Sequence, residues 1–214
     1  MAQTVLIVAG GFSEPFASLP DLSDATLVVA ADGGVDAALA LGLHVDLAIG
    51  DFDSISADGL AALERAGSRI ERHPAAKDAT DLELALDAAL DVAPGRILVV
   101  GSASGRLDHL LSSLELLAST RYSAVEVDAV LGAAVVQVIH GSRALEGLPG
   151  ELVSLQPMHG AARGVVTEGL RYPLAGETLE PGSSRGVSNV FVEREARVSL
   201  EHGVVLAIRP WAQR

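Results

Sequence analysis

The sequence predicts an α/β protein with an amino-terminal, mostly parallel, Rossmann-like domain followed by a small antiparallel β-sandwich domain. As far as residue 120, apolar β-branched runs alternate with helical runs rich in Ala and Leu, which indicates a parallel sheet with crossover helices. Beyond residue 120, strand-like runs follow one another without helices. The 214 residues suffice for two such domains. We therefore expect an α/β domain at residues 1–140 and an antiparallel β domain at residues 141–214.

The strands predicted in the first half end at small or acidic residues, and a helix follows most of them. The predicted strands are residues 4–9, 26–31, 45–49, 68–72 and 96–100, and the predicted helices are residues 35–41, 57–66, 82–90 and 110–118. Ligands of open α/β sheets bind at the carboxyl ends of the strands, so these junctions hold the candidate functional residues. At the first junction, Gly10 and Gly11 are explained most simply by a steric need for glycine, with close approach of a phosphate as the alternative.

Two aspartates separated by one residue follow the predicted strand at residues 45–49. Asp51 and Asp53 lie in the run G-D-F-D-S-I. Mg²⁺ takes oxygen ligands and is usually held by one or two carboxylates together with substrate phosphates. The two aspartates can therefore bind one such cation. Asp, Ser and Gly also favour turns, and a solvated turn explains the segment about equally well.

The junction after residues 26–31 carries an aspartate followed by two glycines, Asp32, Gly33 and Gly34. Asp32 could cap the helix that follows, and the free amide groups of the first helical turn could hold an anion. Capping alone would explain the aspartate. A functional role for Asp32 therefore depends on the other junctions.

The junction before the helix at residues 82–90 combines a lysine with acidic and hydroxyl residues. Thr80 or Asp78 can cap the helix, and Asp81 suits the positive end of the helix dipole. Lys77 lies on the unfavourable side of that dipole, so capping does not explain it. A phosphate bound beside Lys77 would remove the conflict.

The last junction of the first half places Arg106, Asp108 and His109 after a run of small residues. Arginine suits bidentate contact with a phosphate. A surface position at the start of a helix is the alternative explanation for Arg106 and His109. A functional role for this junction is better supported when the strand ends are considered together, because charged residues follow several of them.

The second half is predicted to consist of strands alone. They cover residues 124–130, 134–140, 152–156, 162–167, 188–192, 196–200 and 204–208. Residues 141–150 are rich in turn formers, and His202 and Gly203 separate the last two strands, which predicts a hairpin. This spacing suits a small antiparallel domain.

Composition excludes several classes of function. The chain has no cysteine, so a metal must be bound by oxygen or imidazole. A formal net charge of −13 argues against nucleic-acid binding and suits a cationic small molecule or a metal complex. Polar residues interrupt every apolar run before the length of about 18 residues that a membrane span needs. Because no basic segment precedes the first apolar run, we expect a cytoplasmic protein without a signal peptide.

Six segments, taken together and in order, resemble the thiamine pyrophosphokinase family, also called thiamine diphosphokinase. They are A-D-G-G (31–34), G-D-F-D-S-I (50–55), K-D-A-T-D-L-E-L-A-L (77–86), G-R-L-D-H (105–109), G-L-R-Y-P-L (169–174) and G-V-S-N (186–189). Each segment is weak alone, but the set is specific and covers nearly the whole chain.

The resemblance implies Mg²⁺-dependent transfer of a diphosphoryl group from ATP to the hydroxyl of thiamine, giving thiamine diphosphate and AMP. It implies a homodimer with shared active sites, in which the second domain contributes to thiamine binding and to dimerisation. It assigns Asp51, Asp53 and Asp81 to the metal and to catalysis, Arg106 and Asp108 to catalysis, Asp32, Gly33, Gly34, Lys77, Asp78 and Arg106 to ATP, and Tyr172, Ser188 and Asn189 to thiamine. Asp78, Asp81 and Asp108 are the candidates that could accept the proton of the thiamine hydroxyl.

Two alternatives remain open. The same nucleotide centre could act on another hydroxymethyl heterocycle, such as a pterin alcohol, with Tyr172, Ser188 and Asn189 shaping a different acceptor pocket. The chain could also be a non-catalytic nucleotide-sensing module. The number of carboxylates argues against such a module, because nucleotide binding alone does not require concentrated negative charge beside a triphosphate.

Overall fold

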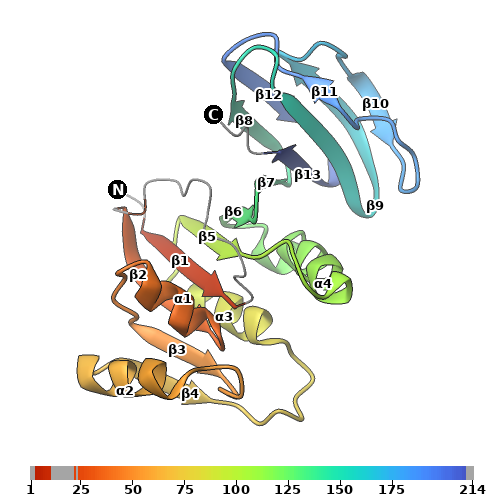
Figure 1. Ribbon diagram of the computed structural model, residues 1–214. Helices are drawn as coiled ribbons and strands as arrows, with labels where there is room; N and C mark the ends of the chain where they lie inside the picture. Colours follow the sequence, from red (N-terminus) through yellow and green to blue (C-terminus); the bar gives the residue numbers. More distant parts are fainter. Residues whose placement is uncertain (1–2, 11–21, 23, 211–214) are drawn as a thin grey trace. The chain divides into compact units, whose positions relative to one another are not determined.

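A computed structural model describes residues 3–10, 22 and 24–210 (Figure 1). The chain divides into two compact units, Met1–Ser113 with Val125–Gly132, and Leu114–Ala124 with Ala133–Arg214. The second unit thus includes residues that a boundary at residue 140 would assign to the first domain. Gly11, predicted to form the first junction with Gly10, lies outside the described residues.

The first unit is built on a parallel sheet with the strand order β4-β3-β2-β1-β5-β6. The strands are β1 (Thr4–Ala9), β2 (Ala25–Ala31), β3 (Leu47–Gly50), β4 (Arg69–Arg72), β5 (Arg96–Gly101) and β6 (Glu126–Leu131). The chain moves outward from β1 to β4 and then returns to β5 on the other side of β1. This reversal is the topological switch of doubly wound folds, so the Rossmann-like prediction is confirmed.

Helices pack on this sheet because its strands are apolar on both faces. The helices are α1 (Gly34–Ala40), α2 (Ala57–Ala66), α3 (Asp81–Leu90) and α4 (Leu107–Leu117). Helices α1 and α3 lie against the strands and α2 lies against α1, whereas the last residues of α4 belong to the second unit. Leu6 and Val8 of β1 belong to a core cluster that also contains residues of α1 and α2, and the alternate residues Val5 and Ile7 are equally buried. Such runs are typical of a parallel sheet that is covered on both faces.

The second unit is antiparallel. Its strands are β7 (Ala134–Ile139), β8 (Ser142–Glu146), β9 (Leu152–Glu168), β10 (Ala175–Leu179), β11 (Asn189–Val190), β12 (Glu195–Ser199) and β13 (His202–Pro210), and a short 3-10 helix covers Thr120–Tyr122. Strands β7, β13, β9, β12 and β8 pair in that order, while β10 and β11 each pair with β9. The predicted antiparallel β-sandwich is therefore confirmed.

Strand β9 is the element that makes this unit a sandwich. Its first part pairs with β13 through Ser154 to Met158, and its second part pairs with β10 and β12. The backbone turns between the two parts at His159 (φ 56°) and Gly160 (φ 131°). Buried residues from both parts, including Leu155 and Val165, share one core cluster. The prediction of two separate strands at 152–156 and 162–167 is wrong, because one bent strand serves both sheets.

Three further local predictions fail in the second unit. Strands β8 and β10 were predicted as turns or left unassigned, because residues 142–146 and 175–179 are mostly exposed and lack a clear apolar alternation. The hairpin predicted at His202 and Gly203 is also wrong. Among the described residues, β12 pairs with β8 and β9, whereas β13 pairs with β7 and β9, so the two strands enter different sheets. Within the described part of the chain, no helix is both long and apolar enough to cross a membrane.

Candidate functional site

Three carboxylates gather at the carboxyl ends of β2 and β3. Asp32, Asp51 and Asp53 each offer an oxygen, and these oxygens lie within 4.8 Å of one another. The parallel register explains the meeting, because Ala31 pairs with Ile49 and both strands end at the same level. The amide of Asp32 donates to the carbonyl of Ile49 at 2.9 Å, which extends the ladder by one bond. Oxygen ligands concentrated in this way suit a hard divalent cation.

The backbone of this acidic cluster adopts unusual conformations. Asp32 (φ 45°) and Phe52 (φ 61°) are left-handed, and Gly50 has φ 148°. Phe52 is 8% exposed, so it anchors the turn in the core while Asp51 and Asp53 on either side are less buried. Left-handed residues other than glycine cost free energy and are concentrated at functional sites. The fold thus maintains this strained turn, which directs two carboxylates to one place.

Asp32 does not cap α1, contrary to the simpler of its two predicted explanations. The N-cap of α1 is Gly33, and no side chain caps the helix. The Oδ1 atom of Asp32 is buried and has no hydrogen-bond partner among the described residues. A buried, unpaired carboxylate oxygen is costly unless a ligand or a cation satisfies it. Asp32 is thus a candidate metal ligand, a role that the resemblance gave to Asp51, Asp53 and Asp81.

Lys77 connects the acidic cluster to the start of α3. Its Nζ lies 2.9 Å from Oδ1 of Asp81 and 3.8 Å from Oδ2 of Asp51, and its side chain is only 13% exposed. Burial lowers the pKa of Lys77, but the hydrogen bond to Asp81 and the charges of Asp81, Asp51 and Asp32 outweigh burial, so the pKa is raised overall. Lys77 is therefore a fixed cation at neutral pH. It is also the only lysine in the sequence.

Local interactions place Asp81 beside Lys77. Thr80 caps α3, because its side chain accepts a hydrogen bond from the amide of Glu83 at 3.2 Å. This confirms one of the two predicted caps and leaves Asp78 exposed. A Cβ atom on Gly50 would lie 3.0 Å from Oδ1 of Asp81, so the glycine makes room for α3 at the end of β3.

Gly34 has a packing role that is independent of any nucleotide. A Cβ atom there would lie 2.0 Å from the carbonyl oxygen of Val8, so only glycine lets α1 approach β1 this closely. Gly33 is less constrained, since its added Cβ atom would meet Ser54 at an ordinary 3.5 Å. The predicted contacts of Gly33 and Gly34 with ATP stay predictions.

Arg106 and Asp108 form a separate, exposed pair. The Nη2 atom of Arg106 lies 2.6 Å from Oδ2 of Asp108, and its Nε donates to Oδ1 at 3.2 Å. The hydrogen bonds from Arg106 hold the pKa of Asp108 below its usual value, and Asp108 raises the pKa of Arg106. Among the described residues, no hydrogen bond or ion pair joins this pair to the acidic cluster.

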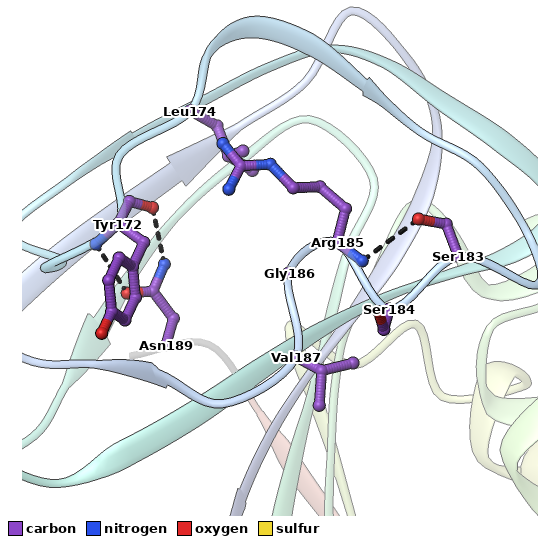
Figure 2. A pocket seen from close by; sticks show the side chains of 8 residues that line it. All are labelled: Tyr172, Leu174, Ser183, Ser184, Arg185, Gly186, Val187 and Asn189. Carbon is purple, nitrogen blue, oxygen red and sulfur yellow. Dashed lines mark hydrogen bonds between the residues drawn. The ribbon is translucent and has the colours of Figure 1, made fainter.

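The second unit contains a cavity of about 400 Å³. The residues that line it are Tyr172, Leu174, Ser183, Ser184, Arg185, Gly186, Val187 and Asn189, as Figure 2 shows. Tyr172 is 54% exposed and Val187 42%, so an aromatic ring and a branched apolar side chain are accessible to a ligand. This volume and this mixture of apolar and hydroxyl groups suit a small organic molecule.

The side chain of Asn189 makes three hydrogen bonds to the backbone, and its predicted contact with thiamine stays a prediction. Its Nδ2 donates to the carbonyl of Tyr172 at 2.8 Å, and its Oδ1 accepts from the amide of Tyr172 at 3.0 Å (Figure 2). The same Oδ1 also accepts from the amide of Val190 at 2.8 Å. The side chain is 3% exposed. Asn189 therefore holds Tyr172 at the cavity. Ser188 does not line the cavity, and its amide donates to Oγ of Ser154 at 3.0 Å.

Sequence analysis missed several lining residues. Ser183, Ser184 and Arg185 lie in a polar, Gly-containing loop before the G-V-S-N segment, outside the segments that carry the resemblance. Leu174 and Val187 lie within the segments G-L-R-Y-P-L and G-V-S-N but were assigned no role of their own, because single apolar residues in loops carry no periodicity. The closeness of this loop to the recognised segment was the available signal.

Comparisons with known proteins match both halves of the chain to one family. Residues 21–129 match the model described as the thiamin pyrophosphokinase catalytic domain, and residues 137–205 match its vitamin B1 binding domain. The chain is 30% identical to the thiamine pyrophosphokinase of Bacillus subtilis over 97% of its length and 98% of that protein.

Solved structures agree with this match. The crystal structure of the Bacillus subtilis protein covers 98% of this chain and 99% of its own chain, with a TM-score of 0.84 and 29% identity. The family protein from Enterococcus faecalis has the same coverage, a TM-score of 0.84 and 26% identity. The Geobacillus thermodenitrificans protein covers 97% of both chains, with a TM-score of 0.81 and 29% identity. With its acidic cluster in the segment that matches the catalytic domain and its cavity in the segment that matches the vitamin B1 binding domain, the chain belongs to the thiamin pyrophosphokinase family of enzymes.

Proposed function

We propose that this protein transfers a diphosphoryl group from ATP to the hydroxyl of thiamine in a Mg²⁺-dependent reaction that releases AMP. The observation that carries the proposal is the cluster of Asp32, Asp51 and Asp53 beside Lys77, inside the segment that matches a catalytic domain. Diphosphoryl transfer requires charge on the phosphate oxygens to be neutralised while the hydroxyl oxygen attacks the β-phosphorus and AMP leaves. A lysine that remains protonated and a divalent cation together meet this need.

The acidic cluster fits Mg²⁺ as its resident metal. All donors are carboxylate oxygens, and one of them, Oδ1 of Asp32, is buried without a partner in the described part of the chain. We assign the metal to Asp51 and Asp53, with Asp32 added and Asp81 retained as a further candidate. When bound, Mg²⁺ would neutralise phosphate charge and orient the triphosphate. Asp81 also fixes Lys77 by the 2.9 Å ion pair, so its role includes positioning that cation.

The remaining charged residues act on the phosphates and on the proton. Lys77 would contact phosphate oxygens from a fixed position. Arg106 would bind them either after its ion pair with Asp108 breaks or while that pair persists. Asp78, Asp81 and Asp108 stay the proposed acceptors of the hydroxyl proton, and the last two are each held by a cation, Asp81 by Lys77 and Asp108 by Arg106. Asp32, Gly33, Gly34 and Asp78 stay proposed neighbours of ATP.

The cavity of the second unit is the proposed site for the acceptor alcohol. Tyr172 offers a ring face for the aromatic rings of thiamine, and Ser183 and Ser184 offer hydroxyl groups to its polar substituents. Asn189 would act through Tyr172, whose backbone it holds on both sides. Ser188 remains a proposed contact from the edge of this loop.

One assay tests the reaction class. Purified protein with thiamine, ATP and Mg²⁺ should form AMP and thiamine diphosphate in equal amounts. Formation of ADP and thiamine monophosphate would overturn the proposal. A hydroxymethyl pterin supplied alone and in competition tests the neighbouring specificity, since faster turnover of the pterin would favour that alternative. ATP binding without any turnover would favour a nucleotide-sensing module.

We also propose a homodimer with shared active sites. Leu107 is 77% exposed and Leu111, one helical turn later, is 57% exposed, so α4 carries an uncovered apolar stripe within the described chain. A two-fold interface would cover this stripe on both subunits at once and create two equivalent composite sites.

Mixed dimers test the sharing of residues. Asp51→Asn would disable the phosphate half of a site and Tyr172→Ala the acceptor half. Refolding the two inactive variants together should restore activity in proportion to the fraction of mixed dimers, because one site then carries both defects and the other carries neither. Mixed dimers that form but stay inactive would mean that each site is built within one chain.

A further inference from the structure

The cavity of the second unit contains a charge that opposes its proposed ligand. Among the described residues that line it, Arg185 alone carries a formal charge at neutral pH. Thiamine is a cation, because its thiazolium nitrogen is quaternary. A guanidinium beside that ring would weaken binding by Coulomb repulsion, and it would strengthen binding of an anion.

Glu177 neutralises this guanidinium from outside the cavity. The Nε atom of Arg185 donates to Oε2 of Glu177 at 3.0 Å, and Nη2 donates to Oε1 at 3.1 Å, a bidentate arrangement. Glu177 lies on β10 and is not among the lining residues. The pair is partly exposed, at 46% for Arg185 and 43% for Glu177. Bidentate geometry fixes the guanidinium more firmly than a single contact would.

The loop that carries Arg185 is itself fixed, so the charge remains beside the cavity. Gly186 has φ 98°, and a Cβ atom there would lie 2.6 Å from the carbonyl of Leu155 on β9. The carbonyl of Gly186 accepts from the amide of Leu155 at 2.9 Å, and the amide of Arg185 donates to Oγ of Ser183 at 3.1 Å (Figure 2). Because the backbone is held on both sides of Arg185, the side chain starts from a fixed point beside the cavity, and the pairing with Glu177 decides where its charge lies.

We propose that the Arg185–Glu177 pair sets the charge selectivity of the acceptor cavity. Glu177 neutralises Arg185 so that the cationic alcohol can bind, and it withholds the guanidinium from the diphosphate group of the product. The proposal rests on the proposed function, because it takes the cavity as the thiamine site. It makes Glu177 a positioning and specificity residue that need not touch the substrate.

Substitutions that remove the charge of Glu177 and of Arg185 should change the affinity for thiamine in opposite directions. Affinities are measured by calorimetry without nucleotide or metal, for thiamine, for an uncharged analogue with a thiophene in place of the thiazolium, and for thiamine diphosphate. Glu177→Gln should weaken thiamine and strengthen thiamine diphosphate, each by about twofold to fivefold, the range of partly exposed charge pairs. Arg185→Gln should do the reverse. The uncharged analogue should bind alike to both variants.

Matched controls separate charge from structure. Glu195→Gln breaks a similarly exposed pair with Arg197 on β12, away from the lining residues, and should change none of the affinities. Glu177→Asp keeps the negative charge and should retain the affinity of the original protein for thiamine. Equal weakening of all three ligands in both Glu177→Gln and Arg185→Gln would overturn the proposal, as would a loss in Glu177→Asp as large as in Glu177→Gln.

Tyr172→Ala distinguishes failure of the charge-pair proposal from failure of the proposed acceptor site. If thiamine affinity falls in this variant but the charge variants show no reversal, the cavity stands as the acceptor site and only the charge-pair proposal fails. If Tyr172→Ala leaves thiamine affinity unchanged, the location of the acceptor site is wrong and the charge-pair proposal fails with it.

Discussion

The acidic cluster of the first unit carries negative charge that the surrounding residues only partly neutralise. In the cavity of the second unit, by contrast, the side chains of Asn189 and Arg185 already have partners within the protein. Among the described residues, Lys77 is the one cation paired with the cluster, and Oδ1 of Asp32 is buried without a partner. In the cavity, Asn189 makes three hydrogen bonds to backbone and Arg185 is paired with Glu177. The proposed metal and phosphates would therefore balance the charge of the first site, whereas the polar groups of the second site already have partners within the protein.

This difference predicts how substitutions divide between activity and stability. In the acidic cluster, removing a carboxylate should cost activity and spare the fold, because like charges repel where no ligand balances them. In the cavity, removing a satisfied polar group leaves its backbone partners unpaired and should cost stability first.

The largest effect is expected from Asp51→Asn and Asp53→Asn. Each should lower turnover on the order of 100-fold or more, the scale of losing one electrostatic contact to a developing charge. The thermal midpoint should stay the same or rise, because repulsion within the cluster is relieved. Turnover across a Mg²⁺ titration and thermal unfolding measure the two effects. Asp91→Asn, at the exposed carboxyl end of α3, is the control. Near-normal turnover in both variants would remove the metal assignment.

Lys77→Ala should lower turnover by roughly 10-fold to 100-fold and leave thiamine binding without nucleotide unchanged. The substitution removes the balancing charge of Asp51 and Asp81, so the thermal midpoint should also fall without metal and recover when Mg²⁺ is added. Lys77→Arg, which keeps the charge, should be less affected. A loss of thiamine affinity in Lys77→Ala would instead mean that Lys77 acts on thiamine and not on the phosphates of ATP.

Because Lys77 is the only lysine, an amine-modifying reagent offers a second measurement on the unaltered chain. Modification of Lys77 should be slow, since its side chain is 13% exposed and its pKa is raised, and ATP with Mg²⁺ should slow it further.

Arg106→Ala should lower turnover less than Lys77→Ala, because Arg106 is exposed and already paired with Asp108. An equal loss in both variants would mean that Arg106 reaches the phosphates in the working enzyme.

The same contrast explains what sequence could predict. Asp51, Lys77 and Asp81 could be proposed from the sequence because each lies between a predicted strand and a predicted helix. That pattern is local and needs no knowledge of strand pairing. The position of Asp32 in the cluster depends on the pairing of β2 with β3, which joins residues far apart in the chain. Local pattern could offer only a cap for Asp32, and α1 begins without a side-chain cap.

The second unit was harder because its architecture depends on tertiary pairing. Residues 152–156 and 162–167 were predicted as separate strands, whereas β9 continues through a bend at His159 and Gly160 and serves two sheets. The sequence drew attention to Asn189 but could not show that its amide is used by Tyr172 and Val190. A buried amide and a ligand-binding amide have the same sequence signal.

Asn189→Ala should therefore act mainly on stability. Loss of its hydrogen bonds leaves two amides and one carbonyl without partners, at a cost of about 1–3 kcal/mol in the free energy of unfolding. The KM for thiamine should rise through the displaced Tyr172, with little change in the KM for ATP. Ser188→Ala is the neighbouring control and should leave stability nearly unchanged. Unchanged stability in Asn189→Ala with a raised KM would instead make Asn189 a direct ligand.

The smallest predicted effect is an acid sensitivity of the second unit, carried by His140. Burial, and then the charge of His159, lower the pKa of His140 below its ordinary value of 6.5, and its Nε2 is buried without a partner among the described residues. The folded state thus favours the neutral ring. Stability from this preference is present above pH 6.5 and is lost as the pH falls from 6.5 through the lowered pKa, because the unfolded chain takes up the proton first.

Thermal unfolding between pH 7.5 and 5.5 measures this loss. The midpoint of the original protein should fall with pH more steeply than that of His140→Gln, which has no ring to protonate. His44→Gln is the control, since His44 is exposed and lies 3.8 Å from Asp46 in the first unit. If His140→Gln and the original protein showed the same slope, protonation of His140 would not be the source of the acid sensitivity.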